Sequence, residues 1–409
     1  MNTYRQLFAI PGVIRLILSA MPGRLAYAMI GLATFFFVEQ STNSVTLAGI
    51  ATGAETIASS LTAGFRGHII DKFGQTIPLS IFVPSWVTAV TVMSQQTHAA
   101  TIVAASLFVG LASPPINLST RPLWRYAVGA ENLRTAYAID TTMMNATTVV
   151  GPFIATAIAI GSGAMYALVF TAACMAIGGV AMITMPLSRT WKPEHVESAT
   201  RTLFSHKPFQ LLAIEGMIFG LGWGILEIAI PSFATITQNP QLSAPLLGTL
   251  AGTSIIGGIL IGGRASSITP LRGFRIAQVA VTLCAAPLAF TSPGWSMGIV
   301  LALLGLSIGF AQVYHWEVLE AVRPEGTATS AAAWLWTMEG SMLAIGAALG
   351  AFLVEHVSAH IALFGVFVGM FSGTAFIWWY ATPYLVKADR QLSEVEMVQA
   401  LVDIEPTRQ

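Results

Sequence analysis

The chain has 409 residues, of which 55% are hydrophobic and only 9% carry a charge. A soluble domain carries about 25% charged residues because its surface must be solvated, so this composition excludes an ordinary soluble protein. The 19 basic and 19 acidic residues cancel, which leaves no net field to attract nucleic acid. We therefore expect a multi-pass membrane protein, with lipid as its solvent and without a nucleic-acid partner.

Apolar windows follow one another along almost the whole chain. A transmembrane helix needs about 20 mainly apolar residues to cross about 30 Å of hydrocarbon. The first window is too long for the core of a signal peptide, so we expect it to be retained. The predicted spans are 13–38, 45–66, 76–95, 99–121, 134–160, 163–187, 208–235, 244–265, 274–291, 296–319, 327–354 and 358–384. The sequence thus predicts an all-α membrane protein with twelve transmembrane helices.

Basic residues are distributed unevenly between alternate connecting segments. When the N-terminus is placed in the cytoplasm, 17 of the 19 Lys and Arg lie in the cytoplasmic segments or at the span ends that border them, and only Arg15 and Arg24 lie inside a span. The opposite loops contain no Lys or Arg. This positive-inside asymmetry predicts a bacterial inner-membrane protein with both termini in the cytoplasm.

A polar segment at 188–207 divides the predicted helices six and six. We interpret it as a cytoplasmic linker between an N-terminal bundle, 1–187, and a C-terminal bundle, 208–386. The tail, 387–409, is modestly amphipathic and is predicted to form a short cytoplasmic or interfacial helix.

A shift of the chain by 199 residues superposes glycines of the two halves. Glycine is common in membrane helices, but six pairs at one gapless offset indicate a duplicated unit. Parallel repeats predict two pseudo-symmetric six-helix bundles, a substrate site near the middle of the membrane and alternating access. The same shift places Asp140 on Glu339. The glycine pairs are Gly49 and Gly248, Gly53 and Gly252, Gly64 and Gly263, Gly74 and Gly273, Gly110 and Gly309, and Gly151 and Gly350.

The segment after the second predicted helix, residues 67–74, reads GHIIDKFG. It resembles the signature loop of the major facilitator superfamily, in which a glycine is followed four residues on by aspartate, then a basic residue, a spacer and a second glycine. Glycines permit a tight turn, and a carboxylate can cap a helix N-terminus or bridge to a base. Gln75 and Thr76 replace two basic residues of the family pattern. The resemblance implies the major facilitator fold and a conformational-switch loop formed by Gly67, Asp71, Lys72 and Gly74.

The fifth predicted helix contains Gly151 and Pro152, which look like a weakened form of the motif that antiporters of this superfamily carry there. A glycine beside a proline allows a close, bendable interface. Residues 136–140 also resemble a branch of bacterial efflux-type permeases. These resemblances favour export, and import stays open because the flanking glycines of the full motif are absent.

Arg24 lies about ten residues, or about 15 Å, into the first predicted helix. A charge at that depth is expensive and usually faces a cavity or a counter-ion, which predicts a role in substrate binding or coupling. The alternative is an arginine that reaches the cytoplasmic headgroups because the first helix begins later.

Five carboxylates lie within the predicted spans, and a desolvated carboxylate can take up and release protons near neutral pH. We therefore expect the proton as the coupling ion, and neither a cofactor nor a metal. Five carboxylates are more than one coupling site needs, so most of them must have a structural role. Solvation near the cytoplasmic end is the alternative for Glu215. The candidates are Glu339, Asp140 and Glu227, ranked first, followed by Glu55 and Glu215.

Helices 1, 4, 7 and 10 line the central cavity of the superfamily's fold, so the resemblance implies a wall that contains Arg24, Asn117, Trp223, Glu227 and Tyr314. His315 can titrate near neutrality, although a headgroup-level belt of aromatic and polar residues explains it equally. Aromatic side chains with few charges suit an amphipathic solute.

These features predict a secondary transporter that exports a small amphipathic solute or drug in exchange for protons, and the resemblance to the superfamily implies a monomer. One alternative is uptake of a sugar or small acid by symport or facilitated diffusion, and another is a receptor or adaptor without transport. An enzyme is not expected, because the sequence offers neither a long catalytic loop nor metal-ligand or nucleotide-binding spacing.

Overall fold

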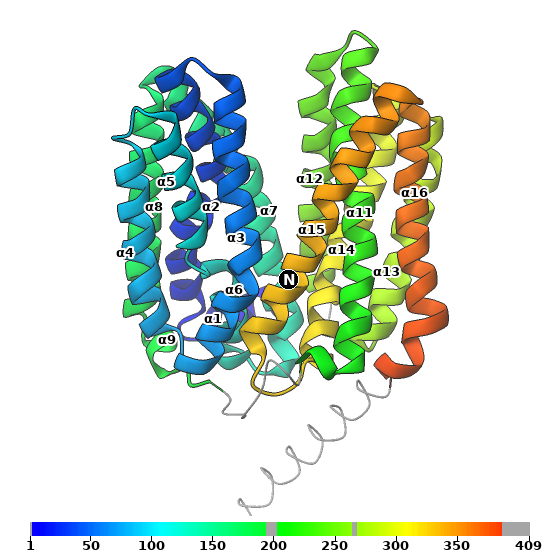
Figure 1. The fold of residues 1–409 in the computed structure, drawn as a ribbon. Helices are drawn as coiled ribbons and strands as arrows, with labels where there is room; N and C mark the ends of the chain where they lie inside the picture. The colour runs from blue at the N-terminus through cyan, green and yellow to red at the C-terminus, as the bar shows by residue number, and fades with distance from the viewer. Residues whose placement is uncertain (1, 194–202, 264–267, 387–409) are drawn as a thin grey trace, which may run out of the picture. The chain divides into compact units, whose positions relative to one another are not determined.

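The computed structural model describes residues 2–193, 203–263 and 268–386 (Figure 1). Helices make up nearly all of these residues, and none of them forms a strand. The predicted tail and the centre of the predicted linker, 194–202, lie outside the described residues. The chain divides into two compact units. Unit 1 comprises Met1–Glu197 and Gly326–Thr337, and unit 2 comprises Ser198–Glu325 and Met338–Gln409.

Unit 1 is a bundle of long helices joined by short connections (Figure 1). Its helices are α1 (Asn2–Ala9), α2 (Val13–Thr42), α3 (Val45–Phe73), α4 (Thr76–Met93), α5 (Ala99–Leu111), α6 (Ile116–Ala127), α7 (Ala130–Gly161), α8 (Ala164–Thr184) and α9 (Pro186–Thr190). The first part of α15 (Ala328–His356) belongs to this unit as well.

Unit 2 contains the rest of α15 and a second set of long helices. These are α11 (Lys207–Ile236), α12 (Ser243–Gly262), α13 (Pro270–Ala285), α14 (Trp295–Val322) and α16 (Ala359–Phe376), with short turns at η1 (Pro240–Leu242), η2 (Ala286–Phe290) and η3 (Ile377–Ala381).

Eleven helical segments of the described chain are long and apolar enough to cross a membrane. The sequence predicts twelve spans, and the one that is absent from these eleven is α3. Its 29 residues include several Thr and Ser and the charged Glu55 and Arg66. Its outer face is nevertheless apolar, because Ile57, Leu61 and Phe65 recur every four residues and are all exposed. Such a stripe of exposed apolar side chains is suited to lipid.

The fourth predicted span, 99–121, is interrupted in the structure. Helix α5 ends at Leu111 and α6 begins at Ile116, with Pro114 and Pro115 between them. A proline lacks the backbone N–H that a helix needs and disfavours helical geometry in the residue before it. After this break the chain forms a separate helix, α6. The polar residues of α6 therefore belong to a helix of unit 1 and not to a connecting loop.

The glycine repeat is visible in how each unit packs. Gly110 on α5 lies against the backbone carbonyl of Glu55 on α3, and Gly309 on α14 lies against that of Ser254 on α12. The same offset of 199 relates both contacts. Because a Cβ atom at either glycine would overlap a backbone oxygen, only glycine allows these helices to approach so closely.

Candidate functional site

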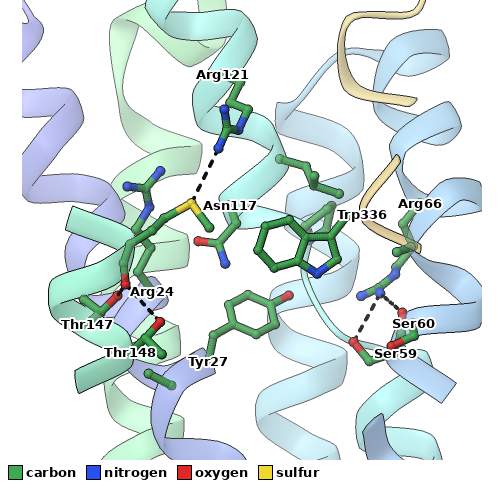
Figure 2. A pocket seen from close by; sticks show the side chains of 15 residues that line it. Arg24, Tyr27, Ser59, Ser60, Arg66, Asn117, Arg121, Thr147, Thr148 and Trp336 are labelled. Atoms are coloured by element: carbon green, nitrogen blue, oxygen red, sulfur yellow. Dashed lines mark hydrogen bonds between the residues drawn. The ribbon is translucent and has the colours of Figure 1, made fainter. Parts of the chain in front are cut away.

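Unit 1 contains a cavity of about 360 Å³ near the middle of α2 and α7. Figure 2 shows Tyr27, Asn117 and Trp336 extending into the same space. The lining side chains come from α2, α3, α6, α7 and the first part of α15. They are Arg24, Tyr27, Ala28, Ser59, Ser60, Ala63, Arg66, Pro115, Asn117, Leu118, Arg121, Met144, Thr147, Thr148 and Trp336.

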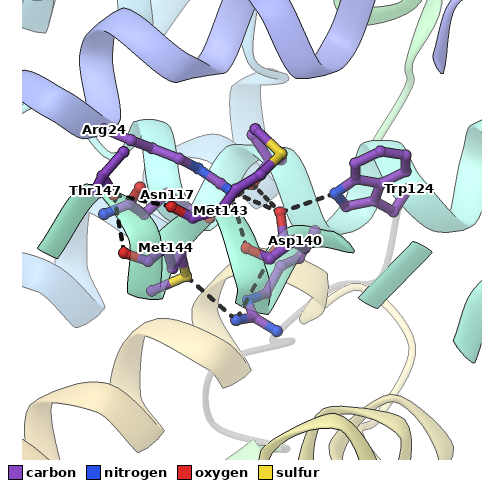
Figure 3. A network of polar contacts seen from close by, with 9 residues as sticks. Arg24, Asn117, Trp124, Asp140, Met143, Met144 and Thr147 are labelled. Atoms are coloured by element: carbon purple, nitrogen blue, oxygen red, sulfur yellow. Dashed lines mark hydrogen bonds and ion pairs between the residues drawn. The ribbon is translucent and has the colours of Figure 1, made fainter. Parts of the chain in front are cut away.

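Arg24 is 2% exposed and is paired with Asp140 across the interface of α2 and α7. Its Nη2 atom lies 2.5 Å from Oδ1 of Asp140 and 2.6 Å from the Thr120 hydroxyl, and its Nη1 donates to the Asp140 carbonyl at 3.2 Å. Figure 3 shows the carboxylate enclosed by its donors. The buried counter-ion that the depth of Arg24 predicts is therefore Asp140, itself one of the predicted residues.

Two further side chains of α6 complete this network. The indole Nε1 of Trp124 donates to Oδ1 of Asp140 at 2.8 Å, and Nη2 of Arg121 lies 3.6 Å from Oδ2. The sequence assigned Arg121 to a cytoplasmic segment, because it is the last residue of the fourth predicted span, 99–121. The proline break moves Arg121 into a buried helix, where it shares a carboxylate with Arg24.

Arg66 is the third guanidinium of the cavity and is 4% exposed. It donates to the carbonyl oxygens of Ser113, Ser59 and Thr62, at 2.5 Å to Ser59 and 3.3 Å to Thr62. It was also assigned to a cytoplasmic segment from the sequence. The second predicted span, 45–66, ends on Arg66, so the sequence placed this arginine at the edge of an apolar window.

Asp71, in the predicted switch loop, caps the N-terminus of α15. Its Oδ1 accepts from the backbone N–H of Thr329 at 2.8 Å, and its Oδ2 accepts from that of Ser330 at 2.6 Å. The first N–H groups of a helix have no partner within the helix, and the helix dipole favours an anion there. Gly67, one turn earlier, allows α3 to approach the backbone of Ser330 and the side chain of Ala333.

The predicted loop is mostly helical in the structure, because α3 continues through residues 67–73 and ends at its C-cap, Gly74. Gly74 has φ 79°, a left-handed conformation that favours glycine. Lys72 is exposed, and its Nζ atom lies 5.2 Å from the ring centre of Phe73. Gln75, which replaces a basic residue of the family pattern, is buried and donates to the Ser119 carbonyl at 2.9 Å. A neutral amide suits a buried site that offers a backbone oxygen as its partner.

Asp71→Ala should weaken this cap. Loss of a capping side chain costs about 0.5–2 kcal/mol, so we expect the N–H groups of Thr329 and Ser330 to exchange about 2- to 30-fold faster. Hydrogen exchange followed by mass spectrometry over residues 326–337 measures this. Lys72→Ala is the matched control in the same loop, and equal protection in the two variants would show that the carboxylate does not hold this segment.

Gly151 and Pro152 lie within α7. Gly151 packs directly against the backbone and Cβ of Ala28 on α2, which brings the two helices that carry Asp140 and Arg24 together. In unit 2, Gly350 on α15 packs in the same way against the backbone of Ile225 on α11.

A second polar cluster lies in unit 2 around Glu215 of α11, which is 1% exposed. Gln278 of α13 donates to its Oε1 at 2.5 Å, and Nδ1 of His315 of α14 lies 3.7 Å from its Oε2. Glu339 of α15 is close enough to repel the Glu215 carboxylate electrostatically. Glu215 is therefore not solvated, and it meets two of the predicted coupling residues, His315 and Glu339.

The remaining candidates make other contacts. Glu55 is buried and accepts from the Thr34 hydroxyl at 2.9 Å, which links α3 to α2. Tyr314 is buried against Gly273 of α13. Trp223 donates to Glu227 one turn further along α11, at 2.9 Å, and Glu227 is exposed.

Comparisons with known proteins agree on one family. A family model described as Major Facilitator Superfamily matches residues 16–347. A curated relative from Sinorhizobium fredii (strain NBRC 101917 / NGR234), described as an uncharacterized MFS-type transporter y4rN, is 26% identical, with 73% of this chain and 78% of that protein covered.

Solved structures share the fold. A bacterial homologue of the iron transporter ferroportin, in an outward-facing state, superposes with a TM-score of 0.73 at 13% identity. The human organic anion transporter MFSD10 (TETRAN) superposes with a TM-score of 0.67 at 12% identity. Each match covers 89% of this chain and 98% of the other. At such identities the likeness shows the fold alone.

Proposed function

The chain belongs to the Major Facilitator Superfamily, and from this premise we propose a secondary transporter that exports a small amphipathic solute in exchange for protons by alternating access. The family match and the transporter neighbours support membrane transport rather than catalysis. We place it in a bacterial inner membrane as a monomer with both termini in the cytoplasm, as the distribution of basic residues and the resemblance favour.

Proton coupling is proposed from the cluster around Glu215. Four helices of unit 2 bring two carboxylates, an imidazole and an amide together where Glu215 has almost no contact with solvent. Neighbouring carboxylates that repel each other can share protons as a group rather than titrating one by one, and a histidine changes charge near neutral pH. This cluster can therefore hold a proton in one conformation and release it in another.

Asp140 is less suited to that task. It already binds Arg24 and lies beside Arg121, so two guanidinium groups balance its charge. We therefore propose Asp140 as a fixed counter-ion of the cavity arginines. The proposed proton carriers are Glu215, Glu339 and His315, and the switch between inward-open and outward-open states is assigned to the loop of Gly67, Asp71, Lys72 and Gly74.

Proteoliposomes that contain the purified protein and a pH-sensitive dye test the coupling. We expect solute-dependent proton movement in the wild type and at least about a tenfold loss in Glu215→Gln, because the amide cannot carry the proton. Glu355→Gln is the matched control, since Glu355 is exposed on α15. Proton movement opposite to the solute supports export by exchange, whereas movement with the solute overturns it in favour of symport. Equal coupling in Glu215→Gln and Glu355→Gln would move the proton site elsewhere.

A further inference from the structure

The contacts of Arg66 leave its charge without a counter-ion in the described part of the chain. Its partners there are three backbone carbonyls and the Ser59 hydroxyl. These neutral groups accept four hydrogen bonds, whereas a guanidinium has five N–H donors, and they do not cancel the charge. A buried cation without a carboxylate is costly, by several kcal/mol, so the described residues leave a balancing negative charge to be supplied beside Arg66.

The cavity that Arg66 lines is rich in cations. Arg24, Arg66 and Arg121 all contribute to the wall, and none of the described lining residues is Asp or Glu. Asp140 contacts Arg24 at 2.5 Å and approaches Arg121 at 3.6 Å, so its charge is directed to these two arginines rather than to Arg66. The space beside Arg66 therefore favours an anion over a neutral or cationic molecule.

The other lining residues restrict the shape of that anion. The indole of Trp336 is 46% exposed and, with Met144, offers an apolar surface to the cavity. The side-chain oxygen of Asn117 is buried and has no hydrogen-bond partner among the described residues, so it can accept a bond from a ligand. A volume of about 360 Å³ lies within the range of small-molecule sites.

We propose that this cavity binds a small organic anion, with its carboxylate or equivalent group on Arg66, its apolar body against Trp336 and a donor group on Asn117. The proposal narrows the amphipathic solute of the proposed function to an acid. Only the transport of this acid rests on the proposed function. The binding itself does not depend on a membrane gradient, so it can be tested alone.

Calorimetric titration of the purified protein in phosphatidylcholine nanodiscs tests the site with three probes of matched shape: 4-phenylbutyrate, 4-phenylbutyramide and 4-phenylbutylamine. We expect the acid to bind at least about tenfold more tightly than the amide, because a hydrogen bond between a guanidinium and a carboxylate is stronger than one to a neutral amide. The amine should bind no better than the amide. Equal affinities of the acid and the amide for the wild type would overturn the proposal without any variant.

Two arginine variants locate the anion. Arg66→Gln should remove the preference for the acid, and Arg66→Lys, which keeps the charge, should retain part of it. Arg15→Gln is the control, because Arg15 is exposed on α2. A preference for the acid that survives in Arg66→Gln would overturn the assignment. If phosphatidylglycerol displaces the acid competitively, the site serves a lipid headgroup and the proposal of a soluble acid is wrong.

The transport assay separates this inference from the proposed function. Selective binding of the acid without solute-dependent proton movement would support the anion site and contradict proton-coupled transport. Coupled movement of the amide or the amine, unchanged in Arg66→Gln, would support transport and contradict the anion site.

Discussion

Asp140→Asn is expected to destabilise the folded protein by about 3–5 kcal/mol, the usual cost of removing one partner from a buried ion pair. The side chains of Arg24 and Asp140 are each 1% exposed, so water cannot solvate the guanidinium once its carboxylate is lost. The asparagine would leave Arg24 buried without its carboxylate. The charge of Arg24 would then be unbalanced beside a second guanidinium, that of Arg121. The free energy of unfolding, measured by SDS titration in mixed micelles, gives the effect.

Arg15→Gln is the matched control for this experiment, since it removes an exposed arginine from the helix that carries Arg24. A change within about 0.5 kcal/mol is expected for such a surface position. The double variant Arg24→Gln with Asp140→Asn should cost less than the two single changes added together, because the residues act as one pair. Additive effects would contradict a direct interaction between them.

Gly110→Val and Gly309→Val should each destabilise the protein by about 1–3 kcal/mol, the usual cost of overpacking a close-packed interior. In each case the new Cβ atom would overlap a backbone carbonyl, of Glu55 or of Ser254. A backbone group cannot rotate away as a side chain can, so the helices must move apart. The free energy of unfolding in the same mixed micelles measures both variants.

Gly49→Val and Gly248→Val are the matched controls, because the same offset relates them and a Cβ atom at either position would meet open space, with no neighbouring atom of the described chain within 4 Å. Valine is more favourable than glycine inside a helix, so these variants should be neutral or slightly stabilising. Similar losses in all four variants would show that the glycines act through helix propensity and not through close packing.

The two units share a repeat but differ in charge. The offset of 199 pairs Asp140 with Glu339, yet Asp140 binds an arginine and Glu339 lies beside a second carboxylate. It also pairs Arg121 with Glu320. The duplicated backbone therefore carries a cationic cavity in unit 1 and an acidic cluster in unit 2. This asymmetry supports a division of labour, with the solute held in unit 1 and the proton in unit 2.

The membrane class, the family and the course of nearly every long helix were predictable from the amino-acid sequence. These properties follow from hydrophobicity summed over about 20 neighbouring residues, from glycine spacing and from a short motif, all of which are local along the chain. The buried state of Arg24 was predictable for the same reason, since its depth in an apolar window is a local property. The motif also suggested that Asp71 either caps a helix N-terminus or bridges to a base, and it did not identify the partner.

The charged groups that contact one another were not predictable from the sequence, because their pairing depends on how the helices pack. The tertiary structure brings Arg24 to Asp140, 116 residues away, and Asp71 to the N–H of Thr329, 258 residues away. It also moves Arg66 into the cavity wall and places Glu215 beside His315. An ion pair depends on the distance between atoms in space, and that distance is set by how the helices pack. Hydrophobicity along the chain shows that a buried charge needs a partner, whereas the packing of the helices selects the partner.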